Sequence, residues 1–291
     1  MPMGHKVRLR NNRTMPYAGF SVEQGRDDTA ADDDSTSWAL ENGYRLCDLG
    51  IGADDAATEV VRDAFQSRRL DRAELFIACR LSPFEMRAGQ VKMALSRLLS
   101  RLSVHHVDLL IIGSVGGRLK LGGRTVRDKA ASVAVCWEAM EDAYKRGLAK
   151  SLGTANLEPS DVENLLRDCQ IAPHVVQSDF NLGSPSVRFQ KFLQRQRIVA
   201  QTMSPLSADA LESETVRELA EHYDRYPAEI VCQWLLQREV AFVERAGRLR
   251  ELELAELRID DFVFKYKDFD RLSKVRVVDT EAEGNDDDEE S

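Results

Sequence analysis

The stretch Val107-Asp108-Leu109-Leu110-Ile111-Ile112 is a short and almost uninterrupted apolar run. A run of this length is typical of a strand that is covered on both faces, as the strands of a parallel sheet are. Leu75-Phe76-Ile77-Ala78-Cys79 has the same character. Between the two runs, apolar residues recur at helical spacing, at Val91, Leu95, Leu98 and Leu102. The alternation of buried strands and amphipathic helices predicts βα units around a parallel sheet.

Eight segments between residues 17 and 260 have the character of such strands. They are Ala18 to Val22, Tyr44 to Leu49, Leu75 to Leu81, Val107 to Ile112, Lys150 to Ala155, His174 to Asp179, Ile198 to Met203 and Val240 to Val243. Eight is the strand number of a (β/α)₈ barrel, which typically takes about 250 residues. Before the first strand, His5 to Met15 has the pattern of a hairpin that turns at Asn11-Asn12. The sequence therefore predicts an α/β protein with one (β/α)₈ TIM barrel and an N-terminal β-hairpin.

The charge of the chain is concentrated at its C-terminal end. The 291 residues are 43% hydrophobic and have a formal net charge of −9. The segment 279–291 holds eight acidic residues and no basic residue, which leaves about −1 for the rest of the chain. A low-complexity acidic segment of this kind cannot bury enough apolar surface to fold. We therefore expect residues 1–278 to form the barrel and residues 279–291 to form a disordered acidic tail.

The nearly neutral body argues against a broad nucleic-acid-binding surface, which needs clustered Lys and Arg. Basic residues gather between Arg118 and Lys129, but this loop lacks the interleaved aromatic residues on which bases stack. The loop either contacts a substrate or partner or is simply solvated. The five cysteines show no metal-ligand spacing, and no apolar run is long enough to span a membrane. We expect no metal site and a cytoplasmic location, with a mitochondrial location as the alternative because the N-terminal residues are basic.

Several motifs follow one another in order along residues 6–258. They include the segment from Gly43 to Asp48, then Ser151-Leu152-Gly153-Thr154-Ala155-Asn156, and then Ser204-Pro205-Leu206. In this order and spacing the chain resembles the aldo-keto reductase superfamily. The resemblance implies a (β/α)₈ barrel that reduces carbonyl groups with NADPH. It also implies four catalytic positions: a tyrosine that acts as general acid, a lysine and an aspartate that tune it, and a histidine that orients the substrate.

Three of these four positions differ in this chain. Asp48 stands at the aspartate position, whereas Ala53, Arg80 and Gly113 stand where the resemblance places the tyrosine, the lysine and the histidine. Hydride addition to a carbonyl leaves an alkoxide that needs a proton, and an alanine methyl cannot donate one. The guanidinium of Arg80 stays protonated, and Gly113 offers no side chain. Losing one donor from such a site commonly lowers the rate about 10²- to 10³-fold, so we expect ordinary reductase activity to be lost.

Other groups near the mouth of the barrel could replace the missing proton donor. The candidates are Asp54, Asp55, Ser114 and Tyr44. The two aspartates also suit the start of a helix, where negative charge is favourable, and this structural role is the commoner one. Asp48 has a structural alternative as well, because a carboxylate at a strand end can pair with an arginine. We therefore predict an ion pair between Asp48 and Arg80.

The resemblance also marks the residues that would hold the cofactor. They are Asn156, Gln177, Ser204, Leu206, Arg245 and Arg248. Two other cofactor positions differ, because Ala155 stands at a serine position and Met203 stands where a tyrosine would stack on the nicotinamide ring. The segment from Phe242 to Arg250 offers three arginines, which suit phosphate geometry, beside Glu244. We expect no bound cofactor as the main outcome, with NADP as the group that would bind if any does.

Two functions follow from these expectations. The first is a catalytically inactive relative of the aldo-keto reductases that acts as a regulatory or structural subunit and binds one or more protein partners. The alternative is a divergent NADP-dependent oxidoreductase that reduces an aldehyde or ketone with altered acid and base residues. A nucleotide is a possible ligand under both, whereas a membrane or a nucleic acid is not an expected partner.

Overall fold

The computed structural model describes residues 5–22, 33–50, 55–81, 90–113, 119–121, 124–126, 133–183, 186–254 and 262–276. Within these residues, eight parallel strands close into a barrel and follow one another around the ring in chain order. They are β3 (Ala18–Val22), β4 (Leu46–Gly50), β5 (Phe76–Leu81), β6 (Leu109–Ile112), β9 (Leu152–Ala155), β10 (Val175–Gln177), β11 (Val199–Met203) and β12 (Val240–Arg245). The predicted (β/α)₈ barrel is therefore confirmed.

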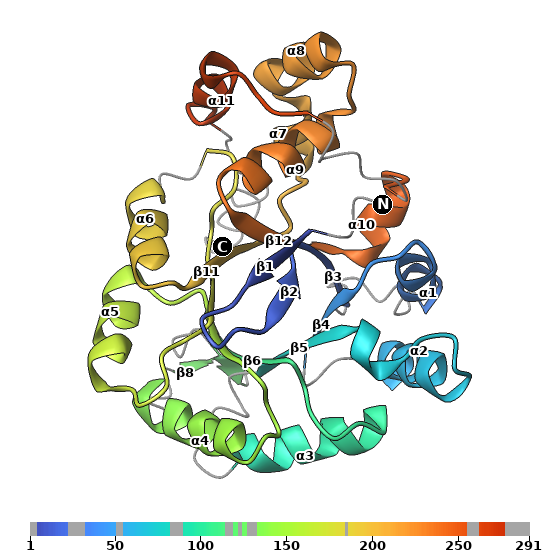
Figure 1. Cartoon of the computed structure of the whole chain (residues 1–291), viewed down its shortest axis with the longest axis vertical. Coiled ribbons are helices and arrows are strands. Elements are labelled where there is room, and N and C mark those ends of the chain that lie inside the picture. The colour runs from blue at the N-terminus through green and yellow to red at the C-terminus, as the bar shows by residue number, and fades with distance from the viewer. Residues whose placement is uncertain are drawn as a thin grey trace, which may run out of the picture.

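Helices surround the barrel (Figure 1). They are α1 (Asp33–Glu41), α2 (Asp55–Gln66), α3 (Gln90–Leu102), α4 (Val133–Lys145), α5 (Pro159–Asp168), α6 (Val187–Arg195), α7 (Ala208–Glu212), α8 (Glu214–Tyr223), α9 (Pro227–Gln237), α10 (Ala246–Glu251) and α11 (Tyr266–Leu272). In α3 the four predicted apolar positions, Val91, Leu95, Leu98 and Leu102, are all buried. These four side chains therefore form one apolar stripe along α3 that packs against the sheet, as in other amphipathic helices.

The predicted N-terminal hairpin is present and lies across one end of the barrel (Figure 1). Its strands, β1 (Lys6–Arg8) and β2 (Thr14–Pro16), pair antiparallel. The turn between them includes Asn12, whose φ of 67° is in the left-handed region that asparagine tolerates better than most residues. Leu9 and Met15 from this hairpin are fully buried and pack against side chains inside the barrel, which closes its amino-terminal end.

The basic loop after β6 has local structure of its own. Two short strands, β7 (Leu119–Leu121) and β8 (Arg124–Val126), pair antiparallel within it.

No helix among the described residues is long and apolar enough to cross a membrane. The acidic tail 279–291 and the position of Ala53 lie outside the described residues, so the division into a barrel and a disordered tail stays a prediction.

Candidate functional site

The strand register brings a layer of polar side chains together inside the carboxyl-terminal end of the barrel. Side chains alternate between the two faces of a strand, so residues two apart point the same way. Leu46, Phe76, Val175 and Val199 lie in the apolar cluster inside the barrel. The residues two positions after Leu46 and Val175 are Asp48 and Gln177, which are buried and polar. The mouth of the barrel is where active sites of this fold are found, so we take this layer as the candidate site.

Asp48 is the centre of this layer. One oxygen of its carboxylate, Oδ2, lies 3.0 Å from Nη2 of Arg80. The side chain of Asp48 is 2% exposed and that of Arg80 is 26% exposed, so the pair is largely shielded from water. The predicted ion pair is therefore confirmed. A carboxylate held in this way is satisfied by structure and does not need a catalytic role to explain its presence.

Arg80 also reaches across the lumen. Its Nη2 lies 3.4 Å from the sulfur of Met203, on β11. Strands β5 and β11 are four positions apart in the ring of eight, so they face each other across the barrel. The guanidinium therefore lies across the mouth and contacts Met203, at the position where the sequence resemblance places a ring-stacking tyrosine.

Gln177 makes a second crossing contact. Its Nε2 donates to Asp48 Oδ2 at 3.1 Å and to Gln201 Oε1 at 2.7 Å. A carboxylate can only accept hydrogen bonds, so Nε2 and not Oε1 must face Asp48. Both hydrogens of the Gln177 amide are then used inside the protein. Only its Oε1 remains to interact with a ligand.

Four polar atoms of this layer are buried and have no hydrogen-bond partner among the described residues. They are Ser21 Oγ, Arg80 Nε, Gln177 Oε1 and Gln201 Nε2. Most buried polar groups in proteins are hydrogen-bonded, so four unpaired polar atoms in one layer are unusual. Ser21 and Gln201 were not among the predicted site residues. The alternation of side chains along a strand could have identified them, because Ser21 is two residues after Gly19 and Gln201 is two residues before Met203, and all four positions face inward.

The described residues contain few candidates for a proton donor at the mouth. Gly113 follows β6 directly and contributes no side chain. Tyr44 is wrong as a replacement, because its ring packs in the outer core against Phe20 and its hydroxyl donates to the Leu254 carbonyl at 2.9 Å. Burial also raises the pKa of Tyr44 well above its usual value. Asp54 and Ser114 lie outside the described residues, and Asp55 begins α2 with a side chain that is not described.

Four of the predicted cofactor contacts are brought together at the ends of β11 and β12. Leu206 and Arg245 both donate their backbone N–H groups to the carboxylate of Glu244, at 3.0 and 2.8 Å. Arg248 donates through Nε to the Leu206 carbonyl at 3.2 Å. Ser204 donates its backbone N–H to the Val243 carbonyl at 2.8 Å. Glu244 is 1% exposed, so this cluster is built around a buried carboxylate.

The sequence singled out the arginines of this segment and gave no role to Glu244, which the structure buries between them. We expected the last strand to end at Val243, but it continues to Arg245. Burial raises the pKa of Glu244, although the two backbone donors and the nearby Arg245 and Arg248 lower it. The remaining predicted contact, Asn156, is exposed, and its φ of 54° lies in the left-handed region. It joins the layer only through its backbone N–H, which donates to the Gln177 carbonyl.

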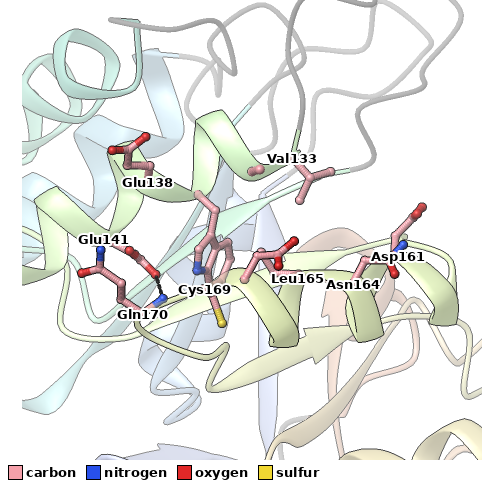
Figure 2. Close-up of a pocket in the computed structure, with 11 residues that line it drawn as sticks. Val133, Glu138, Glu141, Asp161, Asn164, Leu165, Cys169 and Gln170 are labelled. Carbon is pink, nitrogen blue, oxygen red and sulfur yellow. Dashed lines mark hydrogen bonds between the residues drawn. The ribbon is translucent and has the colours of Figure 1, made fainter.

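A separate cleft of about 330 Å³ lies between α4 and α5, on the outside of the barrel (Figure 2). Four carboxylates line it, from Glu138, Glu141, Asp161 and Asp168. Glu141 is used structurally, because its Oε1 accepts the backbone N–H groups of Gln170 and Ile171 at 2.8 Å each. No three His, Cys, Asp or Glu side chains in the described part of the chain are placed to hold a metal ion.

A closed (β/α)₈ barrel with an N-terminal hairpin and polar side chains at its carboxyl-terminal mouth defines the class of protein. The model of the aldo/keto reductase family matches residues 23–276, so the chain belongs to this family. Glyoxal reductase of Bacillus subtilis is 27% identical over 274 residues, which are 92% of each chain. NAD(P)H-dependent 6'-deoxychalcone synthase of Glycine max is 26% identical over 250 residues, 81% of this chain and 79% of the other.

Solved structures agree with the fold. A crystal structure of an aldo-keto reductase of the silkworm, Bombyx mori, has a TM-score of 0.82 at 23% identity, covering 94% of this chain and 88% of that chain. The aldose reductase of Schistosoma japonicum has a TM-score of 0.80 at 24% identity, covering 92% and 91%. A further structure of an aldo-keto reductase, complexed with NADPH, has a TM-score of 0.81 at 22% identity, covering 94% and 88%.

NADP is the cofactor that this family implies, and the residues present fit it poorly. At the nicotinamide end, the unpaired Gln177 Oε1 could accept one hydrogen bond, but both amide hydrogens of Gln177 are engaged. Arg80 reaches Met203 across the mouth. At the phosphate end, the backbone donors of Leu206 and Arg245 are bonded to a carboxylate of the chain itself. One acceptor is available at the nicotinamide end, and the Gln177 amide and the two backbone donors of Leu206 and Arg245 are already engaged.

Proposed function

We propose that this chain is a non-catalytic member of the aldo-keto reductase family that serves as a regulatory or structural subunit of a protein complex. The observation that carries the proposal is the position of Arg80, which pairs with Asp48 and contacts Met203 across the mouth. A guanidinium is a planar cation whose N–H groups donate hydrogen bonds. It can hold charge in place, but it cannot supply the proton that a reduced carbonyl requires.

The neighbouring groups support the same proposal. Gly113 has no side chain, and Ala53 carries only a methyl group. Ser21 is the one hydroxyl in the described polar layer, and a serine hydroxyl transfers a proton only with a base beside it. Asp48 is engaged by both Arg80 and Gln177, so it is poorly placed to act as that base. The layer therefore has charge and hydrogen-bonding capacity without an evident acid.

A divergent NADP-dependent oxidoreductase is the second candidate function. It is favoured by the comparisons, because the similar proteins carry the names of reductases and of an NAD(P)H-dependent synthase. Under this alternative the chain reduces an aldehyde or ketone, and its proton donor is a group other than Arg80 or Gly113. This proton donor would then be a residue at a different position from the tyrosine that serves as the acid in the family.

NADPH oxidation distinguishes the two functions. The full chain at high concentration is mixed with NADPH and glyoxal, and absorbance at the NADPH band is followed. Glyoxal reductase of B. subtilis serves as the positive control under the same conditions. We expect no oxidation above the rate without enzyme. Oxidation that saturates with glyoxal, and that disappears on heat denaturation, would establish the oxidoreductase instead.

The subunit role has its own test. The tagged full-length chain is purified under native conditions from the cells that make it, and the mass of the purified species is measured. We expect a complex that contains a second protein in fixed stoichiometry. A chain that is recovered only as a monomer, without any stoichiometric partner at low salt, would contradict the subunit role.

A further inference from the structure

The loops after β11 and β12 have the location of a phosphate site. These strands are the seventh and eighth of the barrel, counted from β3. In (β/α)₈ barrels, the loops that follow strands seven and eight frequently form a phosphate-binding site. Backbone N–H groups and arginines are the groups that bind phosphate in such places. The N–H groups of Leu206 and Arg245, with the guanidinium of Arg248, are such groups in this chain.

Glu244 already uses the backbone donors. Its Oε2 accepts the N–H of Leu206 at 3.0 Å, and its Oε1 accepts the N–H of Arg245 at 2.8 Å. Leu206 lies in the loop after β11 and Arg245 is the last residue of β12, so one carboxylate joins the ends of the two strands. Arg248 is engaged as well, since it donates to the Leu206 carbonyl and pairs with Glu251 at 2.8 Å.

A phosphate and this carboxylate cannot easily share the same donors. Both are anions, and like charges at close range repel strongly when they are shielded from water. Glu244 is 1% exposed, so salt and solvent screen it little. A phosphate that enters here must either displace a buried carboxylate from two hydrogen bonds or remain outside them.

We propose that Glu244 is an internal anion that holds the donors a phosphate would use, and that it thereby excludes phosphate-bearing ligands from this edge of the barrel. The inference deepens the proposed function and rests on it, because it names the class of ligand that the ends of β11 and β12 reject. It rests on a binding property of two loops, so it can be tested without any catalytic activity.

Calorimetric titration tests the proposal with two probes, inorganic pyrophosphate and NADP⁺. Glu244→Gln removes the charge while keeping an oxygen that accepts one of the two N–H groups. We expect the variant to bind both probes about tenfold or more tightly than the unchanged protein, because it no longer opposes them with a buried charge. Glu212→Gln is the matched control. It removes an exposed carboxylate at the end of α7 that does not contact the two donors, and we expect its affinities to stay within about twofold.

Two results would overturn the proposal. One is equal affinity of the Glu244→Gln variant and the unchanged protein for pyrophosphate. The other is tight, saturable binding of pyrophosphate or NADP⁺ to the unchanged protein, which needs no variant and remains decisive if Glu244→Gln does not fold. In that case, amide resonances of Leu206 and Arg245 in the unchanged protein give a second measurement. We expect them not to move with pyrophosphate up to millimolar concentration.

The outcomes also separate this proposal from the proposed function. An unchanged protein that binds NADP⁺ tightly but oxidises no NADPH would refute the role of Glu244 and leave the non-catalytic role intact. Weak binding to the unchanged protein, tightened by Glu244→Gln, combined with slow reduction of glyoxal, would support the role of Glu244 and refute the non-catalytic role.

Discussion

The two ends of the barrel lumen differ in chemistry and in completeness. At the amino-terminal end, the interior is filled by buried apolar side chains such as Leu46, Leu109 and Val175, and the hairpin closes it with Leu9 and Met15. At the carboxyl-terminal end, the interior is polar and centred on Asp48, and several buried polar atoms there have no partner in the part of the chain that the structure describes. The apolar end accounts for the fold, whereas the polar end is where we propose that the chain departs from the pattern of its family.

Under the proposed function, the chain has kept the fold while it has lost the chemistry of the polar end. Close packing of the apolar end depends on shape and hydrophobic burial, which many sequences satisfy. Proton transfer at the polar end depends on particular groups at particular positions. Substitution of those groups by Arg80 and Gly113 leaves the strand pairing around them intact. Substitutions at each end of the lumen test this difference.

The largest effect is expected for Leu109→Ala at the apolar end. Leu109 is fully buried inside the barrel, so the change removes apolar contacts and leaves a cavity. We expect the free energy of unfolding to fall by about 2 to 5 kcal/mol in urea titration. Met93→Ala, at a site that is 52% exposed, is the control and should change it by less than about 0.5 kcal/mol. A loss below 1 kcal/mol for Leu109→Ala would show that this end is not the stabilising core.

A smaller effect is expected from pH, through His174 just before β10. Burial lowers the pKa of His174 from 6.5 to about 4 in the folded protein, and its Nδ1 accepts the Leu152 N–H at 3.0 Å. The unfolded chain therefore takes up a proton near pH 6.5 while the folded protein does not. Stability is fully present above that pH and is lost as the pH falls toward 4. We expect the free energy of unfolding to drop by about 2 kcal/mol from pH 7 to pH 5.

The control for this pH effect is His174→Asn, whose side-chain oxygen can accept the same N–H but does not titrate. Urea titrations of both proteins at pH 7 and pH 5 give the comparison. The variant should lose most of the pH dependence that His174 contributes. Equal slopes of stability against pH in the two proteins would rule out this role for His174.

The smallest effect on the free energy of unfolding is expected when a serine is replaced by alanine at each end of the lumen, and this pair of variants distinguishes the two ends most sharply. Ser151 lies at the amino-terminal end, and its Oγ accepts a hydrogen bond from Asn11 Nδ2 at 3.2 Å. Ser21 lies at the polar end, and its buried Oγ has no partner among the described residues. We expect Ser151→Ala to cost about 1 kcal/mol in thermal or urea unfolding and Ser21→Ala to be neutral or stabilising. The reverse order would mean that the polar end is as well satisfied as the apolar end.

Much of the fold could be predicted from the sequence because buried parallel strands are continuous apolar runs. The expected strand from Val107 to Ile112 begins at Leu109, although Val107 still forms an isolated bridge to Ala149. Asp108 directly precedes the strand, and its side chain makes the contacts there: Oδ2 accepts the Ile77 N–H at 2.9 Å and pairs with Arg72. A hydrophobic pattern cannot distinguish strand pairing from such side-chain contacts, so the boundaries shifted while the strands themselves were confirmed.

The candidate site could be predicted only in part. The pair of Asp48 with Arg80 was foreseen because opposite charges stood at neighbouring strand ends. The burial of Glu244 was not, because a charged residue beside arginines has the local pattern of a solvated loop. Its burial depends on the Leu206 N–H, which is distant in sequence and meets it only once the barrel has closed. Local pattern carries no information about such a partner.

Deuterium transfer tests the central claim most directly, because it detects even very slow hydride transfer. The full chain is incubated for hours with [4,4-²H₂]NADPH, which carries deuterium on both faces of C4, and glyoxal, and the products are analysed by mass spectrometry. If Arg80 and Gly113 have removed the proton-transfer chemistry, the reduced product will carry no more deuterium than in the reaction without protein. Deuterium in the reduced product that increases in proportion to protein concentration would contradict the account.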